Sequence, residues 1–139
     1  MRWFVALVLG LAAVTASAAG LKVKGITLGA PPPAELSGRL AGSNGVLADT
    51  YLGQPAQLFV RLDREGNVGM LTFRVRADAV HGIASDLTRK YGAPRATAGS
   101  FAWNKSDTEI LLIPTTRLGE DAQLTFTYVG GPRLDPRDM

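Results

Sequence analysis

The stretch Gln57–Arg76, QLFVRLDREGNVGMLTFRVR, decides how this chain of 139 residues folds. Apolar side chains occupy every second position on both sides of a polar loop, Asp63–Asn67, which contains a glycine. Alternation with a period of two is typical of half-buried strands, and a short glycine-containing loop between two such runs indicates a hairpin. The pattern therefore predicts two antiparallel strands, over residues 57–62 and 68–76.

The two faces of this hairpin differ in chemistry, because successive side chains of a strand point to opposite sides. We expect one face to pack inward as a unit, through Leu58, Val60, Leu62, Leu71, Phe73 and Val75. The other face combines arginine with an aromatic ring and a thioether, in Phe59, Arg61, Met70, Arg74 and Arg76. Arginine and aromatic residues are enriched in protein interfaces, so this second set is the predicted binding surface. Two alternatives stay open, an ordinary solvated face and a face covered by the N-terminal segment.

A helix over 79–91 follows the hairpin, with Asp78 as its expected N-cap. It ends in KYGAP, Lys90–Pro94, where Gly92 suits a left-handed C-terminal position and Pro94 prevents continuation. A shorter helix is predicted over 34–40. Further strands are predicted over 46–52, 100–104, 108–113 and 123–129, after a segment at 21–28 that is either a first strand or an extended lead-in.

These elements predict an α+β fold of the order α-β-β-β-α-β-β-β. Consecutive strands with short turns favour an antiparallel sheet, here of about six strands, with one long and one short helix packed on one face. The order of elements in the two halves suggests a degenerate repeat, although no residue-level similarity between the halves accompanies it.

The N-terminus has the build of a secretory signal peptide. Arg2 precedes an apolar run, Trp3–Val14, and Ala16-Ser17-Ala18 supplies small residues for cleavage after Ala18, with Ala19 as second choice. The run is shorter than the roughly 20 residues of a membrane span. The expected organisation is a signal peptide at 1–18, a single domain at 19–129 and a flexible tail at 130–139, in a periplasmic or secreted bacterial protein with no membrane span after cleavage.

The amino-acid composition excludes several kinds of catalysis, metal site and partner. The chain has no cysteine, which excludes disulfides, thiolate catalysis and cysteine-ligated metals. The basic and acidic residues, 15 and 12, are interspersed, so we expect no nucleic-acid partner. A single histidine, His81, and the lack of any phosphate-binding glycine motif lead us to expect no metal and no cofactor.

A resemblance supports a role in binding. The lead-in Lys24–Gly29, the short helix, the sheet, the helix ending in Lys90-Tyr91-Gly92-x-Pro94 and a strand with Trp103 resemble small exported bacterial proteins of uncharacterised families. The element order is similar to that of modules in the outer-membrane assembly lipoprotein BamE and the β-lactamase inhibitory protein. The chain lacks the lipidated cysteine of the first and the disulfides of the second. The resemblance implies a binding or envelope-assembly module rather than a catalyst.

The main hypothesis is therefore an exported, non-enzymatic module that recognises a protein or envelope component through an exposed sheet face. One alternative is a small cell-wall or carbohydrate hydrolase that uses pairs of loop carboxylates, Asp63/Glu65, Asp107/Glu109 or Glu120/Asp121. A second alternative is a self-associating structural protein. The oligomeric state and the identity of the partner stay open.

Overall fold

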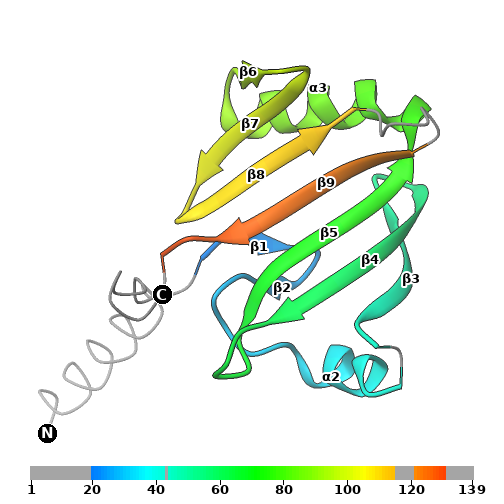
Figure 1. Ribbon diagram of the computed structural model, residues 1–139, viewed down its shortest axis with the longest axis vertical. Helices are drawn as coiled ribbons and strands as arrows, with labels where there is room; N and C mark the ends of the chain where they lie inside the picture. Colours follow the sequence, from blue (N-terminus) through cyan, green and yellow to red (C-terminus); the bar gives the residue numbers. More distant parts are fainter. Residues whose placement is uncertain (1–19, 43, 115–120, 131–139) are drawn as a thin grey trace, which may run out of the picture.

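The computed structural model describes residues 20–42, 44–114 and 121–130, and shows an α+β fold (Figure 1). The expected signal peptide and almost all of the expected tail lie outside these residues. A seven-stranded antiparallel sheet has the order β3-β4-β5-β9-β8-β7-β6, and β1 and β2 form a separate two-stranded hairpin. The strands are β1 Lys22–Val23, β2 Ile26–Thr27, β3 Val46–Tyr51, β4 Gln54–Leu62, β5 Val68–Arg76, β6 Arg95–Thr97, β7 Ser100–Lys105, β8 Thr108–Ile113 and β9 Asp121–Tyr128. The helices are α2 Ala34–Leu40 and α3 Val80–Tyr91, the latter preceded by a 3-10 turn, η1 Ala77–Ala79.

The two halves of the chain meet along β5 and β9, the last strand of each half. From this central pair the strand order runs outward as β5-β4-β3 on one side and β9-β8-β7 on the other. Each half thus consists of a helix followed by a meander, as the α-β-β-β order predicts. The short strand β6 is added at the edge of the second half.

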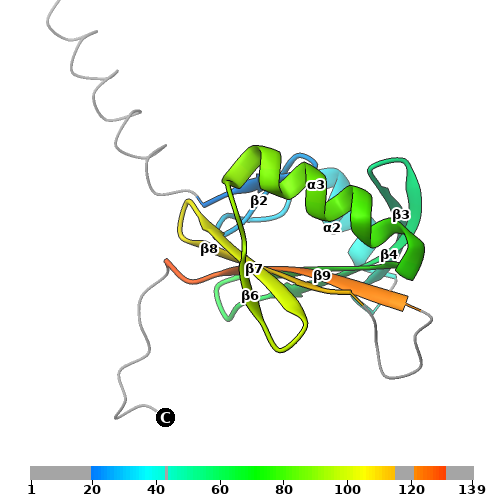
Figure 2. The ribbon, with the colours of Figure 1, turned by 90° about the horizontal axis from the view of Figure 1, so that it is seen from above.

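The core lies between the sheet and a layer formed by α2, α3 and the β1–β2 hairpin, all on one side of the sheet (Figure 2). Alternate residues of the central strands supply it, because one face of each strand is turned toward this layer. Its most deeply buried large side chains are Leu28, Leu58, Leu71, Phe73, Ile83, Leu87, Ile110, Leu112, Leu124 and Phe126. The described part of the N-terminal segment, from residue 20 onward, does not cover the outer face as one alternative proposed, since Val23, Ile26 and Leu28 are buried in this core. No helix within the described ranges is long and apolar enough to cross a membrane.

Two local predictions are wrong. Leu62 does not pack inward but is 42% exposed, because a β-bulge between Arg61 and Leu62 shifts the register at the end of β4. Asp78 is not the N-cap of α3. It lies inside η1 and forms a 3.0 Å ion pair with Arg76, and the N-cap position, Ala79, offers no side-chain hydrogen bond.

The KYGAP segment, Lys90–Pro94, contains the end of α3 and connects it to the sheet through a hydrogen bond. Gly92 has φ 93° and ψ −174°, so φ is positive as predicted, whereas ψ is extended rather than left-handed helical. Its N–H donates to the carbonyl of Thr88 at 2.8 Å. The indole Nε1 of Trp103 donates to the carbonyl of Gly92 at 2.9 Å. The motif therefore has a structural role, fixing the end of the helix against β7.

Candidate functional site

The predicted binding residues all lie on the sheet face opposite the helices. Cross-strand registry establishes this, because Phe59 stands opposite Thr72 and Arg61 opposite Met70, while Arg74 and Arg76 stand opposite Gln123 and Asp121. Each of these pairs alternates with a core-facing pair such as Leu58 and Phe73. We call this surface the outer sheet face.

The outer sheet face has an apolar centre with polar flanks. One cross-strand row is apolar or hydroxyl-bearing and consists of Val46, Phe59, Thr72, Thr125 and Leu111. Within it Thr72 and Thr125 share a 3.3 Å hydrogen bond. The adjoining rows carry Gln57, Arg74 and Gln123 on one side, and Arg61, Met70 and Thr127 on the other. The face is therefore neither uniformly polar nor uniformly apolar.

A hollow of about 680 Å³ lies on this face over β4 and β5. Phe59, Arg61, Met70 and Arg74 line it, together with residues such as Val46, Thr72 and Gln123. Four of the five predicted residues thus contribute to one depression. Arg76 does not line it and pairs with Asp78 instead.

The hollow is basic. No carboxylate from the described part of the chain lines it. Arg74 Nε lies 3.7 Å from Asp121 Oδ2, but both side chains are substantially exposed, so this pair contributes little. Arg61 is exposed and makes no ion pair or hydrogen bond with any residue in the described part of the chain. Its charge is available to a ligand or partner.

None of the loop carboxylates in the described part of the chain lines this hollow. Asp121 begins β9, whereas Asp107 adjoins Thr108, which pairs with Tyr128 at the other end of that strand. Seven residues of strand separate the two ends, about 24 Å. Glu120 lies outside the described residues. Within the described ranges no group of three or more His, Asp or Glu side chains is placed to hold a metal ion, and His81 is exposed on α3.

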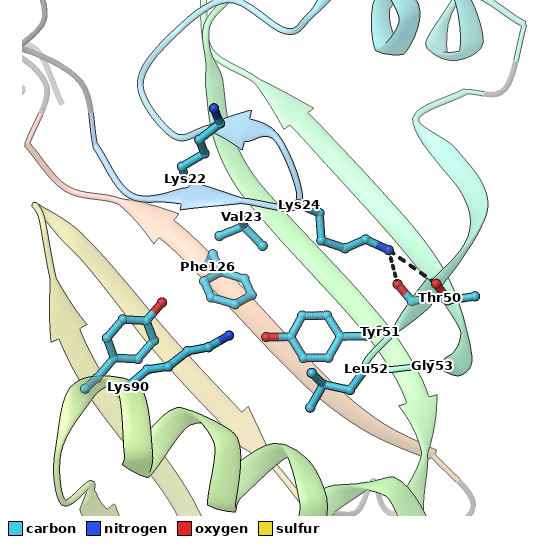
Figure 3. A pocket seen from close by; sticks show the side chains of 10 residues that line it. Lys22, Val23, Lys24, Thr50, Tyr51, Leu52, Gly53, Lys90 and Phe126 are labelled. Atoms are coloured by element: carbon cyan, nitrogen blue, oxygen red, sulfur yellow. Dashed lines mark hydrogen bonds between the residues drawn. The ribbon is translucent and has the colours of Figure 1, made fainter.

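A second hollow, of about 340 Å³, lies on the helix side of the molecule (Figure 3). Its walls come from the β1–β2 hairpin, the β3–β4 turn, the end of α3 and β9, and include Lys24, Tyr51, Lys90 and Phe126. Sequence reasoning missed it, because these residues come from four separate segments and carry no shared motif. We call it the lysine pocket.

Hydrogen bonds and burial set the electrostatics of the lysine pocket. Burial acts to raise the pKa of Asp49, but hydrogen bonds from Lys24 and the Thr50 N–H, with the charges of Lys24 and Arg39, hold that pKa below its ordinary value. Burial raises the pKa of the Tyr51 hydroxyl, and the neighbouring Asp86 carboxylate and Tyr91 add to the effect. Tyr51 therefore stays a neutral hydrogen-bond donor.

Comparisons of the chain with protein-family models, with curated protein sequences and with solved structures found no match. The resemblance to BamE and to the β-lactamase inhibitory protein accordingly stays a prediction.

Proposed function

We propose that this protein is a non-enzymatic binding module of the bacterial cell envelope, which holds a partner protein on the outer sheet face. The observation that carries the proposal is that one face of the seven-stranded sheet has an apolar centre and a basic hollow, with no helix of the described chain over it. The proposal includes export, with removal of residues 1–18.

Burial at this face supports the proposal. Phe59, Met70 and Leu111 are only partly buried, by their neighbours within the sheet. A partner that covered them would remove further apolar surface from water, worth about 25 cal/mol per Å² before the costs of association. Such half-exposed apolar residues beside arginines have the composition of an interface centre.

Charge specifies the kind of partner. Arg61 and Arg74 border the hollow, and no acidic side chain lines it. A complementary surface would present an apolar side chain to the Phe59 region, flanked by Asp or Glu side chains. Arginine favours such carboxylates because its planar guanidinium can make two parallel hydrogen bonds.

The proposal is tested by site-specific photo-crosslinking in cells. A benzophenone amino acid replaces Phe59, which keeps an aromatic group in the hollow, and in a second strain it replaces Ser85, which is exposed on α3 on the opposite side. We expect a discrete protein adduct from position 59 and none from position 85.

Charge reversal supplies the matched control. Arg61→Glu with Arg74→Glu should abolish the adduct from position 59. Arg64→Glu with Lys105→Glu makes the same change in charge at exposed positions outside the hollow and should leave the adduct intact. No adduct from position 59, or an adduct that survives the Arg61/Arg74 reversal, would overturn the proposal. An adduct with the mass of two copies of this chain would favour self-association.

The hydrolase alternative has no such supporting geometry among the described residues. Those of its carboxylates that the structure describes are distributed over both ends of the sheet, and none of these lines either hollow.

A further inference from the structure

Tyr51 brings a hydroxyl group to the lysine pocket from a largely buried side chain. Tyr51 is 6% exposed, and its ring packs against the core, with ring centroids 4.9 Å from Phe73 and 6.5 Å from Phe126. Its hydroxyl makes no hydrogen bond with any described residue, although it borders the pocket. The hydroxyl can therefore donate a hydrogen bond to a group bound in the pocket.

Lys90 supplies a positive charge beside this hydroxyl. Figure 3 shows the Lys90 ammonium and the Tyr51 hydroxyl pointing toward one another across the pocket. Lys90 Nζ lies 3.0 Å from Asp86 Oδ2, close enough for an ion pair, yet that oxygen accepts no hydrogen bond from a described residue. An ammonium group has three N–H donors, so this ion pair leaves donors of Lys90 for a further acceptor.

Charge balance around Lys90 favours an added anion. Asp86 is 8% exposed and also pairs with Arg89, so two cations surround one carboxylate. Lys24 already pairs with Asp49 and donates a hydrogen bond to the carbonyl of Thr50. It therefore lines the pocket but is less available than Lys90 to bind an anion. Lys22 also lines the pocket, and no Asp or Glu of the described residues does so.

The floor of the pocket is apolar. Phe126, Val23 and the ring of Tyr51 form its centre in Figure 3, and Leu52 adds an exposed apolar side chain at the mouth. A volume of about 340 Å³ lies at the small end of the range for ligand sites. The pocket thus combines an apolar floor with a cation and a neutral donor.

We propose that the lysine pocket binds a small organic carboxylate with a flat apolar body, whose carboxylate accepts hydrogen bonds from Lys90 and Tyr51 while its body rests on Phe126 and Val23. This site lies on the helix side, so it is independent of the outer sheet face. The same chemistry occurs in a free acid and in the C-terminal residue of a peptide.

The test is an NMR titration of the purified protein, expressed as the full chain, with 3-phenylpropionate as probe and its amide, 3-phenylpropionamide, as the uncharged match. We expect saturable shifts at Val23, Tyr51 and Phe126 with the acid, and at least tenfold weaker binding of the amide. The peptide Gly-Gly-Phe and its C-terminal amide form a second arm. Tighter binding of the peptide than of 3-phenylpropionate assigns the site to a chain terminus, and the reverse assigns it to a free acid.

Two variants localise the contacts. Tyr51→Phe keeps the ring packing and removes the hydroxyl, so it should weaken the acid about tenfold, as expected for one hydrogen bond to a charged group. Lys90→Met should weaken it at least as much. Lys105→Met, an exposed lysine outside the pocket, should leave binding unchanged. Equal binding of acid and amide, unchanged affinity in Tyr51→Phe, or shifts confined to the outer sheet face would overturn the proposal.

Discussion

Gly29 holds the N-terminal segment against the sheet in a conformation and a space that only glycine fits. Its φ is +83°, and a Cβ at this position would lie 2.7 Å from the ring of Tyr128. Its N–H donates to the carbonyl of Val68 at 2.8 Å. Gly29→Ala should therefore lower the free energy of unfolding by about 2–4 kcal/mol, through backbone strain and collision together. Urea denaturation measures this.

Gly25 provides the matched control, since it has a φ of +81° but nothing within 4 Å of an added Cβ. Gly25→Ala should cost only the backbone strain, about 1 kcal/mol. Equal losses in the two variants would show that the contact with Tyr128 contributes nothing.

The carboxylate of Asp49 makes the free energy of unfolding depend on pH. Asp49 pairs with Lys24, which lines the lysine pocket. Its pKa is lowered from an ordinary value of 3.8, chiefly by the hydrogen bond from Lys24 against the opposing effect of burial. The Asp49 carboxylate thus binds a proton more weakly in the folded state than in the unfolded state. Its contribution to the free energy of unfolding is therefore complete above about pH 5 and is lost as the pH falls through the folded-state pKa. Asp49→Asn should lower the free energy of unfolding by up to about 1 kcal/mol at pH 7, and by less at pH 3. Denaturation at both pH values tests this, and an equal loss at pH 7 and pH 3 would contradict it.

At the scale of elements, the end of α3 depends on a side chain of β7. The Trp103 indole donates to the carbonyl of Gly92, and Trp103 itself is buried. Trp103→Phe removes this hydrogen bond and some packing, and should lower the free energy of unfolding by about 1–3 kcal/mol. It should also accelerate amide hydrogen exchange in the last turn of α3 more than in β5.

Phe101→Leu is the comparison for this variant, because Phe101 shares the face of Trp103 on β7 but makes no hydrogen bond to the helix. It should reduce stability without a selective loss of protection in the last turn of α3. A selective loss in Phe101→Leu as large as that in Trp103→Phe would show that packing alone anchors the helix.

At the scale of the whole molecule, export and removal of the N-terminal segment are the central expectation. Intact-mass analysis of the protein isolated from the periplasm or the medium should give a chain that begins at Ala19, or at Gly20 for the second cleavage choice. A protein that retains Met1 and stays in the cytoplasm would contradict both export and the envelope role.

Local patterns determined much of the fold by themselves. The bounds predicted for α2, β5 and β8 match the structure, and those of most other elements differ by one to three residues at an end. Alternation within β4 and β5 correctly assigned Phe59, Arg61, Met70, Arg74 and Arg76 to one face, because the side-chain direction in a strand follows from its own sequence. The hairpin of β1 and β2 lies where a first strand or an extended lead-in was predicted, whereas β6 was not predicted, since two or three residues hold too little periodicity to recognise.

Only the tertiary structure decided which strands are neighbours and what lies between distant segments. The pairing of β5 with β9 places Phe73 opposite Leu124, and the sequence of neither strand alone identifies the other as its neighbour. The bulge that exposes Leu62 depends on its pairing with β5. The lysine pocket brings Tyr51, Lys90 and Phe126 together from three elements. Side-chain periodicity is a local property of the backbone, so it can be recognised in the sequence. Contacts between remote segments arise only when the whole chain buries its apolar surface at once.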